Sequence, residues 1–172
     1  MRVDVEREFW DRVAHGKNIR HEFIVDKRLK DKDFIKLLKP LLKGYTLEIG
    51  CGIGRLSELY DCGIDISRGM LKKAPKGKEY KVCDGRSIPY PDETFSSVFC
   101  VLVFQHIPDI QSYIDEAYRV LKPGGKFIFQ FIQGNSREGA MSFKHTPILT
   151  GWHRYRAFEG ILPDWTWGEA TK

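Results

Sequence analysis

The chain has 172 residues, of which 42% are apolar and 30% charged, with a formal net charge of +5 and an isoelectric point near 9.0. This length and composition predict one folded domain and exclude wholesale disorder, and no apolar run reaches the ~20 residues of a membrane span. The N-terminus lacks the apolar core of a secretory signal and the four cysteines have no paired spacing, so we expect a cytoplasmic protein without metal or disulfides.

Residues 1–43 are expected to form a helical cap, and they hold most of the net charge. They contain 12 basic and 8 acidic side chains, whereas residues 44–132 contain 11 of each. Apolar residues recur at helical spacing in two stretches, Val5–Val13 and Phe34–Leu42. The basic side chains form either a solvated helical face, as such runs usually do, or a patch that faces an anionic substrate or RNA.

From residue 44 onward, short apolar strands alternate with helical or turn segments. The strands are expected at Tyr45–Ile49, Cys62–Ile66, Glu79–Cys83, Ser97–Val103 and Lys126–Ile132. The clearest helix is expected over Asp109–Lys122, with Asp109 as its N-cap and Pro123-Gly124-Gly125 ending it. Strands that are apolar on both faces and joined by helices predict an α/β fold, a Rossmann-like, doubly wound and mainly parallel sheet over residues 44–132.

The most informative stretch is a glycine loop that follows the first strand. It reads Gly50-Cys51-Gly52-Ile53-Gly54-Arg55. Alternate glycines let the backbone turn tightly and let a ligand lie against the main chain. The dinucleotide fingerprint requires glycine where Arg55 stands, and no Gly-Lys-Ser/Thr follows, so a nucleoside without phosphates fits better than a pyrophosphate. The segment 55–62 then leaves room for a helix of about two turns.

Two acids end the next two strands. Asp65 ends the second strand and Asp84 follows the third, so both are expected at the carboxyl edge of the parallel sheet. Asp65 either accepts hydrogen bonds from ribose hydroxyls or caps the helix that starts at Arg68. Asp84 is placed to accept a hydrogen bond from an exocyclic amine.

These pieces, in this order, resemble the class I S-adenosylmethionine-dependent methyltransferases, and most closely the methyltransferase type 11 group. The resemblance rests on Glu-x-Gly-x-Gly-x-Gly, Gly-Ile-Asp-Ile-Ser, Asp84-Gly85, Ile88–Phe95, Phe104–Asp109 and Glu116–Gly125. It implies a sheet with strand order 3-2-1-4-5, followed by an antiparallel hairpin that is abbreviated in this chain. It also implies S-adenosyl-L-methionine as the cofactor and S-adenosyl-L-homocysteine as its product.

The resemblance also implies a cofactor-binding role for ten residues. They are Glu48, Gly50, Cys51, Gly52, Gly54, Asp65, Ile66, Asp84, Gly85 and Gln105. The glycine loop would hold the methionine and ribose portion, with Glu48 orienting the loop and contacting the ammonium. Asp65 would bind the ribose, Ile66 would pack on adenine and Asp84 would take the adenine amine. Gln105 would lie near the sulfonium end.

His106 follows the fourth strand, where the methyl acceptor is expected to arrive. It is the candidate general base for a hydroxyl acceptor, or alternatively its hydrogen bonds fix the loop before Asp109. The Asn/Asp-Pro-Pro-Tyr motif of the family members that methylate DNA adenine or glutamine is absent, because the sequence there reads Val103-Phe104-Gln105-His106. This absence argues against adenine-N6 chemistry.

Residues 133–172 are expected to be an irregular, aromatic-rich tail that completes the same domain. The aromatic side chains either cover the sheet edge or form an acceptor pocket or subunit contact. The leading hypothesis is in-line methyl transfer to a small-molecule O, N or C acceptor by a monomer or homodimer. An RNA methyltransferase, especially one acting on tRNA, and a cofactor-binding subunit that needs a partner for activity are the alternatives.

Overall fold

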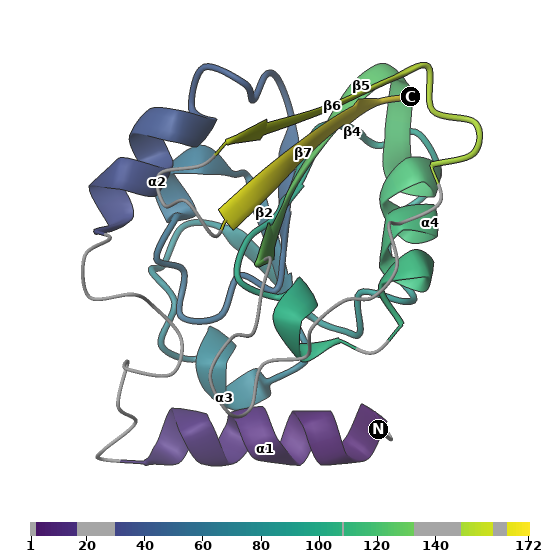
Figure 1. Cartoon of the computed structure of the whole chain (residues 1–172). Helices are drawn as coiled ribbons and strands as arrows, with labels where there is room; N and C mark the ends of the chain where they lie inside the picture. Colours follow the sequence, from purple (N-terminus) through teal and green to yellow (C-terminus); the bar gives the residue numbers. More distant parts are fainter. Residues whose placement is uncertain (1–2, 17–29, 108, 133–148, 160–164) are drawn as a thin grey trace.

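The computed structural model describes residues 3–16, 30–107, 109–132, 149–159 and 165–172. One seven-stranded sheet organises these residues, with strand order β3-β2-β1-β4-β5-β7-β6 (Figure 1). The strands are β1 (Thr46–Ile49), β2 (Cys62–Asp65), β3 (Glu79–Val82), β4 (Phe95–Cys100), β5 (Leu121–Ile132), β6 (Arg154–Glu159) and β7 (Trp165–Thr171). The first five strands are parallel in the order 3-2-1-4-5, which confirms the predicted fold class.

Helices cover both faces of the sheet and one of its ends. The helical elements are α1 (Val3–His15), α2 (Asp31–Leu38), η2 (Ser57–Leu59), α3 (Arg68–Leu71), η3 (Phe104–His106) and α4 (Ile110–Val120). In Figure 1, α2 and α4 lie on opposite sides of the sheet, and α1 crosses its lower end beside α3. The two-turn helix expected after the glycine loop is only the short 3₁₀ turn η2.

Two apolar cores form because side chains alternate across the sheet. On one face, Val98 packs with the predicted stripe of α4, in which Ile114 and Ala117 are fully buried. On the other face, Phe99 packs with Phe34 and Leu38 of α2. Asp109 caps α4 as predicted, since its side chain accepts a hydrogen bond from the backbone N–H of Ser112. The sheet is therefore buried on both sides, as an all-parallel core requires.

The C-terminal residues form the antiparallel hairpin that the family resemblance implies, and the expectation of an irregular tail is wrong for residues 154–159 and 165–171. Strand β7 pairs antiparallel with both β5 and β6. Trp167 is fully buried and packs against Phe34, with ring centroids 6.2 Å apart. Tyr155 stacks on Phe129 and Trp152 on Phe127, so these aromatic residues cover the sheet as one of the two alternatives expected. The remaining tail residues, 133–148 and 160–164, lie outside the described ranges.

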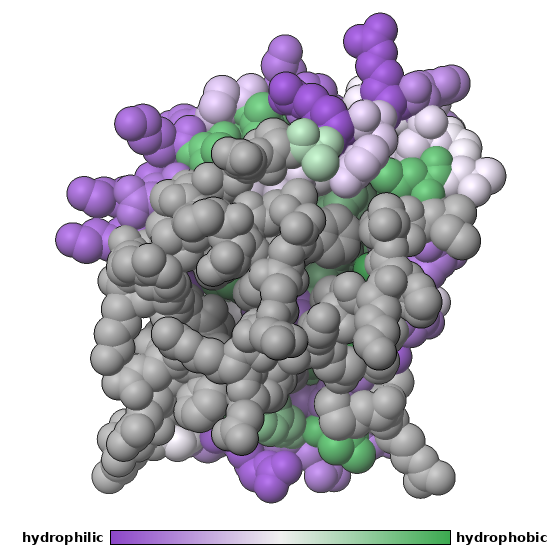
Figure 2. Space-filling view, viewed as in Figure 1, coloured by the Kyte–Doolittle hydropathy of each residue, from purple (hydrophilic) through white to green (hydrophobic). Residues whose placement is uncertain are grey.

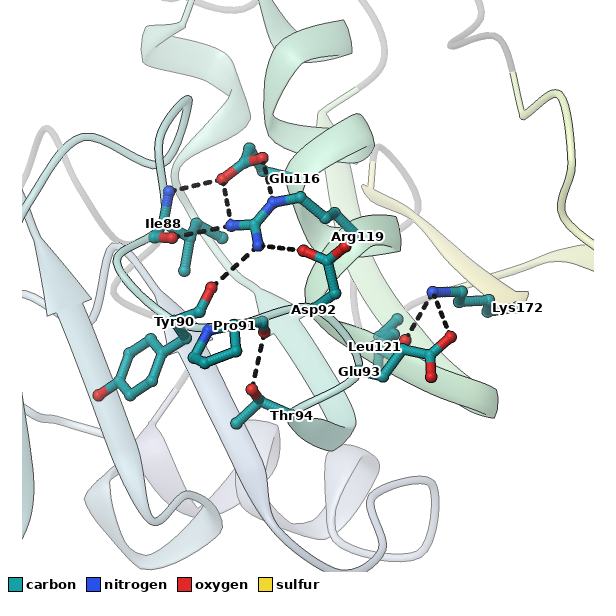
Figure 3. Close-up of polar contacts among 10 residues, drawn as sticks. All are labelled: Ile88, Tyr90, Pro91, Asp92, Glu93, Thr94, Glu116, Arg119, Leu121 and Lys172. Carbon is teal, nitrogen blue, oxygen red and sulfur yellow. Dashed lines mark hydrogen bonds and ion pairs between the residues drawn. The ribbon is translucent and has the colours of Figure 1, made fainter.

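Arg119 of α4 ties the loop after β3 to that helix (Figure 3). Its guanidinium donates to both carboxylate oxygens of Glu116, at 2.7 and 2.8 Å, and to the Asp92 carboxylate at 2.7 Å. It also donates to the carbonyls of Ile88 and Tyr90, at 2.8 and 2.9 Å. Two motifs far apart in sequence, 88–95 and 116–125, thus meet in one polar network that fixes the entrance to β4.

The surface seen in Figure 2 is mainly hydrophilic at its rim, where purple side chains project. Along α1, however, Val5 and Phe9 keep 45% and 49% of their surface exposed. Among the helices of the described ranges, none is both long and apolar enough to cross a membrane.

Candidate functional site

A cavity of about 530 Å³ opens where the carboxyl ends of the parallel strands meet α1. This is the end of an open α/β sheet where ligands bind, and the volume falls within the range of about 300–1,000 Å³ that is usual for small-molecule sites. The wall contains nine of the eleven residues singled out from the sequence. They are Glu48, Gly50, Cys51, Gly52, Asp65, Ile66, Gly85, Gln105 and His106.

The glycine loop presents bare backbone to this cavity. Gly50 has φ +74°, and a Cβ at this position would come within 2.3 Å of Val103 Cγ2, so only glycine fits. Gly52 has φ +54°, and nothing lies within 4 Å of the position a Cβ would take. A ligand can therefore approach the main chain at Gly52. Gly54 does not line the cavity, and a Cβ at this position would come within 2.6 Å of Pro75 Cδ.

Asp65 joins the end of β2 to the glycine loop. One carboxylate oxygen accepts the backbone N–H of Gly52 and the other accepts that of Ser67, both at 2.8 Å. Ser67, rather than Asp65, caps α3, since its hydroxyl accepts the backbone N–H of Met70. Burial raises the pKa of Asp65 even though both backbone donors lower it. Each oxygen keeps a lone pair for a further donor in the cavity.

Glu48 is a buried acid in the cavity wall, with only 4% of its surface exposed. Its Oε2 has no hydrogen-bond partner among the described residues. Burial, reinforced by the nearby Asp65 carboxylate, raises the pKa of Glu48 well above the usual range. An unpartnered buried carboxylate is costly, so this position is suited to a ligand that brings a cationic donor.

Asp84 does not line the cavity, although the adjacent Gly85 does. The guanidinium of Arg86 donates to both of its carboxylate oxygens, at 2.7 to 3.0 Å, and the backbone N–H of Arg86 donates at 2.9 Å. Burial raises the pKa of Asp84, but these hydrogen bonds outweigh it and the net pKa is lowered. Gly85 leaves room for the ring of Tyr113, which would lie 2.2 Å from a Cβ there.

The loop after β4 contains a strained residue held by two amide side chains. Leu102 has φ +61°, which is uncommon for a residue other than glycine. Its backbone N–H donates to Gln130 Oε1 at 3.2 Å, and its carbonyl accepts from Gln105 Nε2 at 2.9 Å. Gln105, although it borders the cavity, is thus used to shape the loop. Strain of this kind persists where surrounding contacts over-determine the backbone.

His106 borders the cavity at the end of the same loop. Its Nε2 is buried and has no partner within the part of the chain that the structure describes. Burial lowers the pKa of His106 to about 4, so the ring is neutral near pH 7. The ring packs edge-on against Trp10, with centroids 5.1 Å apart. Among the described residues, therefore, no hydrogen bond from Nε2 fixes this loop.

Helix α1, which the sequence predicts only as part of a helical cap, supplies one wall of the cavity. Glu6, Phe9, Trp10 and Val13 all border the cavity. Asp11 anchors the helix, because its carboxylate accepts from Ser67 Oγ at 2.5 Å and from the backbone N–H of Gly69 at 2.9 Å. One feature of the sequence could have indicated this wall. Glu6 is an acid that lies one helical turn before Trp10 on an otherwise apolar face of the helix.

Comparisons with known proteins agree with this architecture. The methyltransferase domain family matches residues 47–129. The ubiquinone/menaquinone biosynthesis C-methyltransferase UbiE of Desulfotalea psychrophila is 34% identical over 98 residues, 49% of this chain and 40% of that protein. The phosphatidylethanolamine N-methyltransferase of Cereibacter sphaeroides is 29% identical over 142 residues, 70% of this chain and 68% of that protein.

A solved structure from Thermotoga maritima, an S-adenosylmethionine-dependent methyltransferase and possible histamine N-methyltransferase, superposes with a TM-score of 0.70. The match covers 98% of this chain and 96% of that one at 21% identity, so it shows a common fold that includes the C-terminal hairpin. This chain spans about half the length of the first curated relatives it matches.

Proposed function

Because the chain belongs to the class I S-adenosylmethionine-dependent methyltransferases, within their type 11 group, we propose that it binds S-adenosyl-L-methionine in this cavity and methylates a small-molecule acceptor. The observation that carries the proposal is Glu48, a buried carboxylate with an unpartnered oxygen beside the glycine loop. The cofactor's ammonium would give that oxygen the cationic donor it lacks.

The other residues of the wall fit a nucleoside. Asp65 would receive ribose hydroxyls on its remaining lone pairs, and Ile66 would pack on the adenine face. The open space at Gly52 leaves room for the ligand to touch the backbone. We assign Asp84 a positioning role, because hydrogen bonds from Arg86 occupy both of its oxygens.

When bound, the cofactor would supply a methyl group on its sulfonium sulfur: the acceptor's lone pair would bond to the methyl carbon, and the electron pair of the broken carbon–sulfur bond would stay on sulfur. The chain contributes placement and a largely apolar environment, which favours a reaction that discharges a cation. A hydroxyl acceptor also loses a proton. We assign the removal of that proton to His106, whose neutral ring borders the cavity and whose Nε2 has no partner among the described residues.

A small acceptor is favoured by the size of the cavity, since the cofactor and acceptor must share about 530 Å³. The relatives support the same class, because quinone C-methyltransferases and a phosphatidylethanolamine N-methyltransferase are among them. RNA methylation and a partner-dependent subunit are the competing hypotheses, and the experiment below separates them.

Titration calorimetry with S-adenosyl-L-methionine and S-adenosyl-L-homocysteine is the first test, and absence of binding at millimolar ligand refutes the proposal. Radiolabelled methyl transfer into cell-extract fractions is the second. We expect label in the small-molecule fraction, unaffected by nuclease and nearly independent of salt. Nuclease-sensitive label that declines steeply with salt identifies an RNA substrate. Cofactor binding with transfer only after a second protein is added identifies a partner-dependent subunit.

A further inference from the structure

Glu6 of α1 is a second buried acid in the cavity wall, and the proposed function assigns it no role. Only 4% of its surface is exposed. Its Oε2 accepts a hydrogen bond from Arg86 Nη2 at 3.0 Å, across 80 positions of sequence. Its Oε1 is also buried, and it lacks a partner within the described ranges. The proposed contact between Glu48 and the cofactor gives this oxygen of Glu6 no partner.

The charges around Glu6 leave an excess of one negative charge. The same Nη2 of Arg86 also donates to Asp84 at 2.7 Å, so one guanidinium serves two carboxylates. The other cations that border the cavity are not close partners of Glu6: Arg55 pairs with Asp31, and Arg12 is exposed. Lys73 is exposed as well. A cation from outside would balance this wall.

Aromatic rings border the same part of the cavity. Trp10 lies one turn after Glu6 on α1, so both side chains emerge on one helix face. Tyr113 faces the cavity from α4, beside Gly85. The His106 ring in contact with Trp10 is neutral near pH 7 and adds no positive charge. A carboxylate with neighbouring aromatic rings is the usual environment for an organic cation.

We infer that Glu6 and Trp10 recognise a positively charged nitrogen on the methyl acceptor, so that the substrate class is a small amine or ammonium compound. This inference rests on the proposed function. Two carboxylates of the cavity wall, Glu6 and Glu48, each have a buried oxygen without a partner among the described residues, and the cofactor has one ammonium, which Glu48 would take. The inference concerns recognition: if the recognised nitrogen is also methylated, it first releases its proton to solvent, because only the free amine has a lone pair.

The experiment compares wild type with Glu6→Gln and with Glu8→Gln, a matched control on the exposed side of α1. All three proteins are first titrated with S-adenosyl-L-homocysteine, which tests the proposed function by itself. Each saturated protein is then titrated at pH 7 with 2-phenylethylamine and with its neutral counterpart 2-phenylethanol. We expect wild type and Glu8→Gln to bind the amine about tenfold or more tightly than the alcohol, and Glu6→Gln to lose this preference.

Three results would overturn the inference while leaving cofactor binding intact. They are equal binding of amine and alcohol by wild type, no binding of either, and an unchanged preference in Glu6→Gln. A Glu6→Gln variant that loses affinity for S-adenosyl-L-homocysteine would instead place Glu6 against the cofactor, for example at the adenine amine. If Glu6→Gln does not fold, as judged by circular dichroism, the inference is tested by wild type alone: it stands if wild type prefers the amine to the alcohol and fails if it does not. Failure of wild type to bind S-adenosyl-L-homocysteine refutes the proposed function instead.

Discussion

Replacing Glu48 by glutamine should stabilise the protein without cofactor and weaken its affinity for the cofactor. The carboxylate is buried and Oε2 is unpartnered within the described residues, so folding at neutral pH must either bury an uncompensated charge or take up a proton. The folded-state pKa of Glu48 is raised, and the free energy of unfolding therefore falls as pH rises from the usual carboxyl pKa of about 4.3 toward the raised value. Glutamine keeps the shape and removes this decline.

The magnitude follows from the buried group. An unsatisfied buried polar group costs about 1–3 kcal/mol, and each unit of pKa shift corresponds to about 1.4 kcal/mol. We expect Glu48→Gln to gain about 1–3 kcal/mol at pH 8 and little at pH 4. A chain of this length converts each kcal/mol into a Tm increase of about 2–4 °C. Loss of a charge-assisted hydrogen bond to the ammonium, about 1.5–3 kcal/mol, should weaken cofactor binding by about 10- to 150-fold.

Thermal unfolding of the cofactor-free protein at pH 4 and pH 8, with calorimetric titration of S-adenosyl-L-homocysteine, measures both effects. Glu58→Gln is the matched control, because Glu58 is an exposed acid outside the cavity wall. A variant of Glu48 that is less stable at pH 8 yet binds the ligand like wild type would refute the reasoning. That result would mean that the Glu48 carboxylate stabilises the glycine loop and does not bind a cationic group of the ligand.

Three further predictions concern the rest of the site and its support. Asp65→Ala should weaken binding of S-adenosyl-L-homocysteine by about 1–3 kcal/mol in calorimetric titration, whereas Asp115→Ala, at an exposed position on α4, should not. Arg119→Met should lower the free energy of unfolding in urea by about 2–3 kcal/mol with ligand affinity unchanged, and the exposed Lys122→Met serves as the control. His106→Ala should reduce turnover on an identified hydroxyl acceptor by about 100-fold or more while the Kd for the cofactor changes little, and equal turnover would exclude a catalytic base at this position.

The parallel strands and the position of the glycine loop could be predicted because their signals are local, whereas the strand order 3-2-1-4-5 followed from the family resemblance. A buried strand, alternating glycines and an acid at the next strand end are readable within about 20 residues, and parallel topology then brings the strand ends together. Glu48, Asp65 and Ile66 border one cavity for this reason. The capping of α4 by Asp109 was equally local, because a cap needs only the following turn.

The sequence by itself therefore determined the sheet of five parallel strands and, through the glycine loop and the motifs that follow it, the resemblance to the methyltransferase family. Only the tertiary structure decided the rest, because it depends on contacts between distant residues. The family resemblance implied a C-terminal hairpin, but only the pairing of β7 with β5 decided its register and which aromatic residues it buries. Arg86 donates hydrogen bonds to both Asp84 and Glu6. It thereby occupies the carboxylate of Asp84, which was predicted to bind the ligand, and it holds Glu6, which was not predicted, in the cavity wall. No local pattern specifies a pairing across 80 residues; packing of α1 over the strand ends does.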